Sequence, residues 1–349
     1  MGVVTTTLTL PEPRTPDPMD APPLRWGILA PGGIARTMAA ALRAATRQEI
    51  VAVGSRDLGR ARAFADEFGI GTAYGSYAEL VADPSVDVVY VASPHSEHRD
   101  QTLLALDAGK HVLVEKAFAR NRTEALEMVE RARSRGLFLM EALWTRFLPH
   151  VDVIRRSLEE GLLGDLVTVF ADHGQPLHPG GPRRLADPVL AGGALLDLGV
   201  YPLHFADLVL GGLESVSTVG ALTAEGVDAQ EAMTVVGPSG ALGVLHATML
   251  AKTPTTASVV GSLARIDVDG DRFYGPSDLT LATRGGVLDT WQPPSRDHGL
   301  HFEAAEVARC ITAGRTESPL LPLDTTLRVM AAMDAVRRDL GVVYPGERP

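Results

Sequence analysis

Lysine and cysteine are the two residue types that this sequence uses least. Only Lys110, Lys116 and Lys252 occur among 32 basic residues, so the remaining 29 are arginines. Arginine cannot replace an amine that must sit beside a reacting proton, so each lysine is a candidate for chemistry. The one cysteine, Cys310, excludes a disulfide framework and a thiolate zinc cage. No run of about 18 apolar residues is found, so we expect no membrane span.

The composition is that of an ordinary globular protein with two domains. Of the 349 residues, 45% are hydrophobic and 21% are charged. The net charge of −11 argues against a nucleic-acid partner, because such proteins usually show a basic face. Residues 1–23 are rich in threonine and proline and lack the pattern of a secretory signal. We interpret them as a flexible lead, with Met19 as a possible true start, and expect a cytoplasmic location.

The rhythm of the sequence changes near residue 147. Between residues 24 and 146, short apolar runs alternate with helical stretches, which predicts a doubly wound parallel sheet. Beyond that, a long helix near residues 190–210 precedes strand-like runs joined by short turns, which indicate a mostly antiparallel, open-faced sheet. We predict an α/β dinucleotide-binding domain at 24–146 and an α+β substrate and dimerisation domain at 147–349. The last helix, 323–340, could pack back on the first domain.

The first apolar run ends in a turn of small residues, Ala30-Pro31-Gly32-Gly33-Ile34-Ala35. Ala30, Gly32 and Ala35 occupy the three small positions of a dinucleotide fingerprint, which serve a tight turn, close approach of the pyrophosphate and helix–strand packing. The helix that follows would present its amino terminus, with Gly33 and Ile34, to the anion. Alanine in the first position weakens the match, but the turn is the first between a strand and a helix. We therefore predict dinucleotide binding here.

The second strand ends in Gly54-Ser55-Arg56-Asp57. An NAD enzyme usually places an acid here for the ribose hydroxyls, whereas Ser55 and Arg56 suit a 2′-phosphate. Arg60 follows one turn later, and we interpret Asp57 as the cap of the helix between them. Solvated surface charge is the alternative for both arginines. We predict NADP rather than NAD.

Lys116 ends another apolar run, at the edge where open α/β sheets hold ligands. In the second half of the sequence, Asp197 and Tyr201 are four residues apart, so they share one helix face, and His204 follows on the same side. A phenol is a poor proton donor at neutral pH, and a nearby ammonium would lower its pKa. Lys116 and Tyr201 can meet only if the cleft lies between the domains. The alternative is that Tyr201 is a half-buried helix aromatic and Asp197 a capping acid.

Taken together, these segments resemble the Gfo/Idh/MocA family of oxidoreductases. The resemblance covers residues 24 to about 340 and rests on the Ala30–Ala35 turn, Ala92–His98, Ala108–Lys116 and Gly192–Tyr201. Within the family, Met140–Phe147 and a tyrosine in place of the usual helix histidine resemble the branch of dimeric dihydrodiol dehydrogenases and sugar 1-dehydrogenases. The resemblance implies a Rossmann domain and an α+β domain whose open sheet forms a homodimer or a dimer of dimers.

The resemblance also implies residue roles. Lys116 and Tyr201 would transfer a proton beside the nicotinamide, and Asp197 would orient the substrate or the acid. The residues expected around the nicotinamide and its ribose are Ser93, Pro94, His98 and Glu115. The chain departs from the family in having Ala117 where proline usually follows the lysine. This puts the family's unusual peptide geometry in doubt, since a cis bond before alanine is costly.

We predict an NADP-dependent oxidoreductase that transfers a hydride between the nicotinamide and a secondary alcohol or hemiacetal carbon of a sugar-like or diol substrate. The candidate pocket residues are Trp144, Arg146, His150, Arg183, Arg184, Asp197, Tyr201 and His204. We expect no metal site, because His173 and His178 lack a metal-ligand pattern. A short-chain dehydrogenase would need Tyr-x-x-x-Lys, which is missing. The alternative is a catalytically silent NADPH-sensing regulator of the same fold, but the presence of both Lys116 and Tyr201 favours an enzyme.

Overall fold

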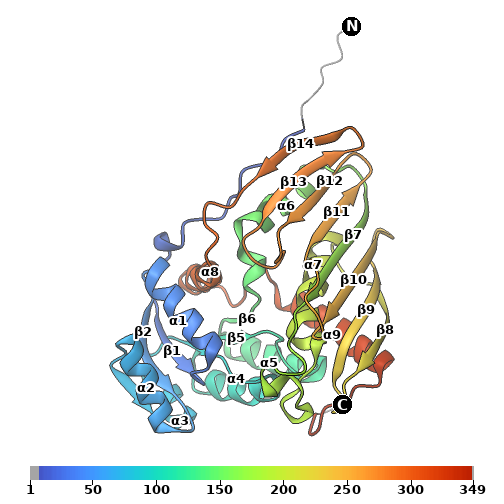
Figure 1. The fold of residues 1–349 in the computed structure, drawn as a ribbon. Helices are drawn as coiled ribbons and strands as arrows, with labels where there is room; N and C mark the ends of the chain where they lie inside the picture. The colour runs from blue at the N-terminus through green and yellow to red at the C-terminus, as the bar shows by residue number, and fades with distance from the viewer. Residues whose placement is uncertain (1–7, 348–349) are drawn as a thin grey trace.

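The computed structural model describes residues 8–347, which form two sheets linked by helices (Figure 1). The first sheet has six parallel strands in the order β3-β2-β1-β4-β5-β6, which is the doubly wound Rossmann order. Its elements are β1 (Arg25–Leu29), α1 (Gly33–Ala45), β2 (Glu49–Gly54), α2 (Leu58–Phe68), β3 (Thr72–Tyr74), α3 (Tyr77–Ala82), β4 (Val88–Val91), α4 (His98–Asp107), β5 (His111–Glu115), α5 (Arg122–Arg135) and β6 (Leu139–Ala142).

The local sequence accounts for where the strands and helices of this parallel-sheet half begin and end. The central strands are covered on both faces, so they are continuous apolar runs, and every residue of β4 is buried. The Asp57 carboxylate accepts hydrogen bonds from the Gly59 and Arg60 amides, which confirms the predicted cap of α2. Gly69 and Gly136 end α2 and α5 with positive φ, as left-handed helix caps. The three-residue strand β3 was not predicted, because so short a run carries little pattern.

The second sheet has eight strands in the order β14-β13-β12-β11-β7-β10-β9-β8. All neighbouring strands are antiparallel except β7 and β10, so the predicted fold class is confirmed. The elements of this half are η3 (Trp144–Phe147), α6 (Pro149–Glu159), β7 (Leu166–Gly174), α7 (Val200–Leu210), β8 (Ser215–Leu222), β9 (Asp228–Val236), β10 (Leu242–Thr248), β11 (Ala257–Gly261), β12 (Arg265–Asp269), β13 (Asp278–Thr283), β14 (Gly286–Trp291), α8 (Leu300–Thr312) and α9 (Leu323–Leu340).

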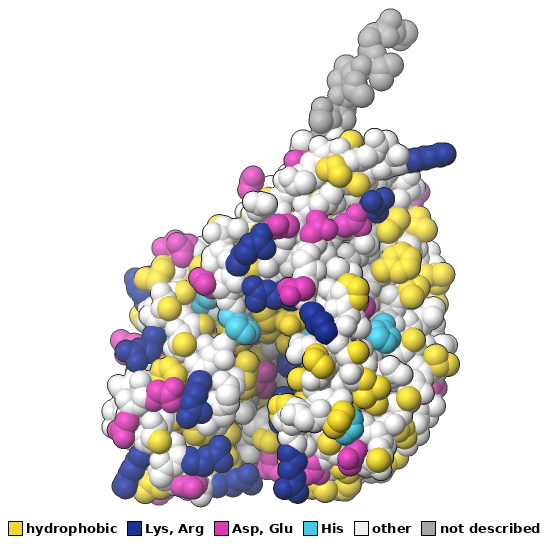
Figure 2. All heavy atoms as spheres, viewed as in Figure 1, with side chains coloured by type: hydrophobic (Ala, Val, Ile, Leu, Met, Phe, Trp, Pro, Cys, Tyr) yellow, Lys and Arg dark blue, Asp and Glu magenta, His cyan; other side chains and the backbone are white. Residues whose placement is uncertain are grey.

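The two faces of this sheet differ. Helix α7 packs on one face, against β7 and β10. The opposite face carries Phe170 paired with Val244, and Thr168 paired with Leu242, and the three apolar side chains are about half exposed. Figure 2 shows hydrophobic side chains gathered on this side of the molecule, at the right of the view. The sheet therefore has one covered face and one open, partly apolar face.

The long helix expected near residues 190–210 is broken into pieces. A short turn at Pro188–Leu190 is followed by Ala191 and Gly193, both with positive φ, and by a π-helical turn at Leu195–Gly199 that leads into α7. The Asp228 carboxylate from β9 accepts a hydrogen bond from the Leu195 amide at the start of this turn. Gly192 and Gly193, which precede the π-helical turn, disfavour a helix, so the regular helix is shorter than predicted.

Pro188–Leu210 is also apolar enough, at a mean hydropathy of 1.4, to resemble a membrane span. In the folded chain, 89% of its most apolar window is buried inside the molecule. It is the core helix of the molecule, so its length and composition do not indicate a span.

The last two helices connect the halves. Helix α8 packs on α1, and α9 packs on α5 and β6 as well as on α7 and β8. At the α5–α9 contact, the Arg122 amide donates to Asp334 at 2.9 Å and Arg133 pairs with Asp324 at 2.8 Å. The carboxyl-terminal part of the chain therefore covers one side of the nucleotide domain, which keeps the two sheets in a fixed relation.

The segment before β1 is packed against the rest of the molecule. The Leu10 amide donates to Asp289 of β14 at 2.9 Å, and the Arg14 guanidinium bonds to Asp152 and Glu159 of α6. Arg309 of α8 donates to the Asp17 carbonyl at 2.6 Å. These contacts correct the expectation of a flexible lead for residues 8–23. Residues 1–7 of the predicted lead lie outside the described residues.

We predict that Arg14→Ala lowers the free energy of unfolding by about 1–2 kcal/mol, because the Asp152 side chain is only 3% exposed and loses a charged partner. Equilibrium urea unfolding would measure this. Arg36→Ala is the matched control, since Arg36 and Glu67 are both 45% exposed and such pairs contribute less than about 0.5 kcal/mol. Equal effects of the two changes would show that the lead does not stabilise the fold.

Candidate active site between the two sheets

The turn after β1 has the geometry expected of a pyrophosphate site. Ala30 adopts a positive φ of 67°, and Gly32 precedes α1 without any side-chain cap on its first amides. A Cβ atom at Gly33 would meet nothing within 4 Å, so the space over the helix amino terminus is open. Ala35 is fully buried against the sheet, and Ile34 packs beside it. These residues fit a bound dinucleotide, with the helix amides facing its phosphates.

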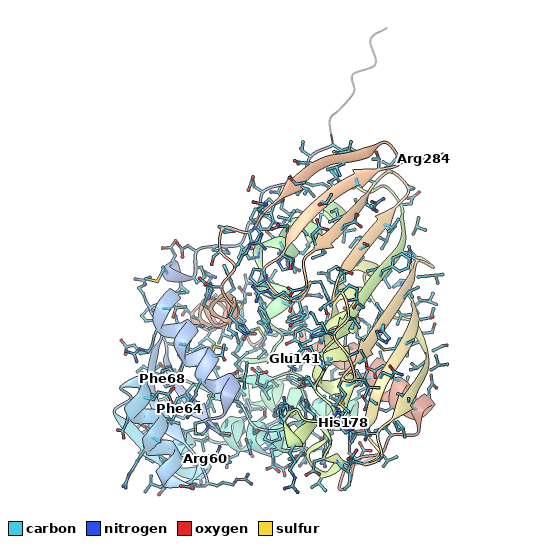
Figure 3. All side chains as sticks on the ribbon, viewed as in Figure 1. Arg60, Phe64, Phe68, Glu141, His178 and Arg284 are labelled. Carbon is cyan, nitrogen blue, oxygen red and sulfur yellow. The ribbon has the colours of Figure 1, made fainter. Side chains whose placement is uncertain are left out.

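At the end of β2, Ser55 is buried and its hydroxyl accepts a hydrogen bond from the Asp57 amide at 3.2 Å. Arg56 and Arg60 are exposed, and neither lies within 4.0 Å of a carboxylate anywhere in residues 8–347. Figure 3 labels Arg60 at the lower end of α2, with Phe64 and Phe68 further along the same helix. The structure therefore places two exposed guanidinium groups at and after the end of β2, where they suit a 2′-phosphate, and Arg56 is also hydrogen-bonded to the Tyr77 side chain.

The residues expected around the nicotinamide and its ribose lie at the ends of β4 and β5 and in the loops that follow them. Both ring nitrogens of His98 contact carbonyl oxygens, that of Ala117 at 2.9 Å and that of Ser93 at 2.8 Å, which fixes the two loops together. The Ser93 hydroxyl is buried and has no hydrogen-bond partner among the described residues, so it is available to a ligand. Pro94 follows it at the start of a 3₁₀ turn.

The peptide bond between Lys116 and Ala117 is cis. The unusual peptide geometry, which the replacement of proline by Ala117 had put in doubt, is therefore present. Next to it, the Glu115 carboxylate accepts hydrogen bonds from Tyr90 and from the Lys116 amide. Burial raises the pKa of Glu115 to about 7, although its hydrogen bonds and the Lys116 charge oppose the shift.

Lys116 reaches across to the other half of the chain. Its Nζ lies 2.7 Å from the Asp197 carbonyl oxygen and 3.3 Å from Asp197 Oδ1, and Arg184 donates to the same Oδ1 at 3.0 Å. Burial by itself raises the pKa of Asp197, but the charges of Lys116 and Arg184 outweigh it and hold that pKa below its usual value. Asp197 is therefore a carboxylate that anchors two cations at the boundary between the sheets.

Tyr201 lies one turn beyond Asp197, in the first turn of α7. Lys116 Nζ is 5.1 Å from the centre of its ring, and Trp144 Nε1 donates to its hydroxyl at 3.1 Å. Burial raises the pKa of Tyr201 well above its usual value, against the opposing effect of the Trp144 hydrogen bond. The expected depression of this pKa by Lys116 is not found, because the ammonium lies over the ring and is bonded to Asp197.

The structure adds three aromatic residues that the sequence did not single out for the site. The His173 ring on β7 stacks on Tyr274 at 4.2 Å and meets Tyr201 edge-on at 5.2 Å. Tyr274 also contacts Tyr201 at 5.0 Å, and His298 lies over Trp144 at 5.0 Å. Burial, with the Lys116 charge, lowers the pKa of His173 to about 3, so its imidazole is neutral. No local pattern marks these residues, because they come from β7 and from two separate loops.

Several predicted pocket residues lie elsewhere. The Arg146 guanidinium donates to the carbonyls of Leu320 and His204, away from the Lys116–Tyr201 pair. The His204 ring is 2% exposed and lies 3.1 Å from Glu141, which Figure 3 shows at the centre of the molecule. His150 is fully buried beside the Phe273 carbonyl, and Arg183 is exposed on the loop before Arg184. The structure does not bring these four residues to the Lys116–Tyr201 pair.

The arrangement is suited to proton transfer between the two halves. The carboxylate of Asp197 and the phenol of Tyr201 are one helical turn apart, and the Lys116 amine reaches both from the end of β5. This is the edge of the parallel sheet where a dinucleotide would lie. Figure 2 shows the surface hollowed between the two halves, with charged and histidine side chains at the rim. Among residues 8–347, no group of three or more His, Cys, Asp or Glu side chains could hold a metal ion.

Comparison with solved structures finds the same architecture. A 3-ketoreductase from Actinomadura kijaniata, solved with TDP-benzene and NADP, has a TM-score of 0.77 and 29% identity over 90% of this chain and 97% of its own. An aldose-aldose oxidoreductase from Caulobacter crescentus has a TM-score of 0.82 at 24% identity, covering 92% of this chain and 98% of its own, and supports the fold alone.

Comparison with characterised sequences identifies the family. The trans-1,2-dihydrobenzene-1,2-diol dehydrogenases of Bos taurus and Homo sapiens are each 38% identical, over 93% of this chain and 99% of their own. Residues 24–143 match the model of the Gfo/Idh/MocA oxidoreductase family with its NAD-binding Rossmann fold, and residues 151–267 match the family's C-terminal domain. The chain therefore belongs to the Gfo/Idh/MocA family of oxidoreductases, and it is an enzyme that acts on CH–OH groups.

Proposed function

We propose that this protein is an NADP-dependent oxidoreductase that transfers a hydride between the nicotinamide and a secondary alcohol or hemiacetal carbon of a diol or sugar-like substrate. The observation that carries the proposal is the convergence of Lys116, Asp197 and Tyr201 between the two sheets. The names of the relatives, which are diol dehydrogenases and a ketoreductase solved with NADP, support this substrate class and this cofactor.

Tyr201 is the proposed proton-transfer residue. Because burial raises its pKa, the phenol is protonated at neutral pH and can donate to an alkoxide oxygen as a carbonyl substrate is reduced. In the oxidative direction the acceptor of the alcohol proton is the phenolate form of Tyr201, which is the form that proton donation leaves in the reductive direction. The hydride chemistry is supplied by the nicotinamide when it is bound.

Lys116 and Asp197 support this step. The Lys116 ammonium stabilises the negative charge that passes between substrate oxygen and phenolate, and this stabilisation is strong because the site is largely buried. Asp197 holds the ammonium over the Tyr201 ring and, through its hydrogen bond from Arg184, ties the loop that carries Arg184 to the site. The aromatic side chains of Trp144, Tyr274 and His298 are proposed as the walls against which the substrate packs. Arg146 and His204 are left out of this assignment because of their contacts elsewhere.

We predict that Tyr201→Phe and Lys116→Met each lower kcat by about 10²- to 10⁴-fold on a responsive diol or sugar, since each removes one part of the proton transfer. Lys252→Met is the control for loss of a lysine, because Lys252 donates to Thr255 Oγ1 and the Asp271 carbonyl and to no proposed catalytic residue within the described part of the chain. Steady-state rates on purified variants with unchanged circular dichroism would decide. Folded variants that keep most of the turnover would refute the roles of both residues.

For the cofactor, we predict that Arg56→Ala weakens NADPH binding by about 10- to 100-fold and leaves NADH binding unchanged, because a charge-assisted contact with the 2′-phosphate is lost. Arg62→Ala is the matched control, an exposed arginine of α2, the helix that follows Arg56. Fluorescence titration with both nucleotides would measure the effect. An unchanged affinity of the Arg56 variant for NADPH would remove the assignment.

We also propose a homodimer, or a dimer of dimers, that forms through the open face of the second sheet. The exposed apolar residues Phe170, Leu242 and Val244 lie together on adjacent strands, and exposed patches of this kind mark protein interfaces. The predicted cytoplasmic location is kept as part of this proposal, with the apolar segment Pro188–Leu210 buried as the core helix.

We predict that Phe170→Glu converts the assembly to a monomer in sedimentation velocity, because it places a charge at the centre of the apolar patch. Leu104→Glu, at a 36% exposed position on α4, should leave the sedimentation coefficient as in the unmodified protein. If the unmodified chain is already a monomer at micromolar concentration, the proposed interface is wrong.

A further inference from the structure

A second cavity, of about 640 Å³, lies between the segment before β1, α6, α8 and the chain leading to α9. We call it the α6–α8 cavity. Its volume is in the range of small-molecule sites. None of Lys116, Asp197, Tyr201 and Trp144 lines it, so it is separate from the proposed active site.

The charges around the α6–α8 cavity do not balance. Five arginines and three acids line it. Asp152 and Glu159 are already paired with Arg14 and Arg155, and Glu306 accepts hydrogen bonds from the Cys310 thiol and the Ser318 hydroxyl. The acids of the cavity are therefore already engaged, and the excess charge around it is positive.

Three arginines of the cavity have no carboxylate partner. Across residues 8–347, no carboxylate oxygen lies within 4.0 Å of Arg146, Arg309 or Arg315. Arg309 donates to the Asp17 carbonyl, and Arg315 is exposed at the rim. Arg146 is largely buried and is held by two carbonyl oxygens only, at 2.9 and 3.3 Å. A buried guanidinium is costly without an anion, and burial lowers the pKa of Arg146 to about 10.

The remaining walls are apolar. Phe147, Leu208, Phe302 and Leu320 line the cavity, together with Ala313 at the end of α8. A planar carboxylate matches the fork of an arginine, and an apolar body of about one ring would cover these side chains. Inorganic phosphate would satisfy the guanidinium groups but would leave the apolar walls uncovered.

We propose that the α6–α8 cavity binds a small organic carboxylate with an apolar body, whose carboxylate pairs with Arg146 and Arg315. Arg146 connects this site to the catalytic elements. It lies two residues after Trp144 and donates to the carbonyl of His204, three residues after Tyr201. The bound carboxylate is an additional ligand and not the substrate, because the proton-transfer residues do not line the cavity.

Calorimetric titration of the full chain with benzoate would test the proposal. We expect a dissociation constant of about 1 mM or below, and at least tenfold weaker binding of the neutral isostere benzamide. Inorganic phosphate is the third probe. Binding of benzamide as tightly as benzoate, or binding of phosphate without benzoate, would overturn the proposed ligand class.

Three variants locate the binding. Arg315→Gln, at an exposed position, should weaken benzoate binding about fivefold, and Arg146→Gln by more than tenfold. Ala313→Phe fills the cavity from an exposed position and should abolish binding. Arg284→Gln, on the distant β13–β14 turn labelled in Figure 3, is the control with the same charge change and should stay within twofold. Should Arg146→Gln fail to fold, the other two variants decide, and unchanged affinity in both refutes the site.

Discussion

The contact between Lys116 and Asp197 is the interaction on which the arrangement of the proposed active site depends. It joins the end of a parallel strand to a π-helical turn 81 residues later, with side chains that are 14% and 10% exposed. A buried ion pair is stable only if its remaining polar groups are satisfied, and here the Asp197 carbonyl and Arg184 complete it. Tyr201 follows one turn later, so this contact sets the amine against the phenol.

The second sheet packs against the π-helical turn that carries Asp197. Asp228 on β9 bonds to the Leu195 amide where the turn begins, and His173 on β7 packs against Tyr201. On β7, His173 and Phe170 are three residues apart and therefore lie on opposite faces, and the face that carries Phe170 stays open and partly apolar. The same pleated alternation therefore supports the active site on one side and provides the proposed dimer surface on the other.

The buried environment decides how the groups of the site behave. Burial among aromatic rings keeps the Tyr201 phenol protonated and the His173 imidazole neutral. Asp197 stays charged because the Lys116 and Arg184 cations face it. Arg146 is held only by carbonyls, on the side of η3 that faces the α6–α8 cavity. One short segment, Trp144–Phe147, thus contributes Trp144 to the proposed active site and Arg146 and Phe147 to the proposed carboxylate site.

What the sequence by itself determined is local: the alternation of strands and helices in the first half, the turn at Ala30–Ala35, the cap at Asp57, and the four-residue spacing of Asp197 and Tyr201. These follow from hydrogen bonds and apolar periodicity within about ten residues. Only the tertiary structure decided that His173, Tyr274 and His298 surround Tyr201, that Arg146 and His204 face elsewhere, and that the Lys116–Ala117 bond is cis. Contacts between distant segments are set by the packing of whole elements, and no local pattern encodes them.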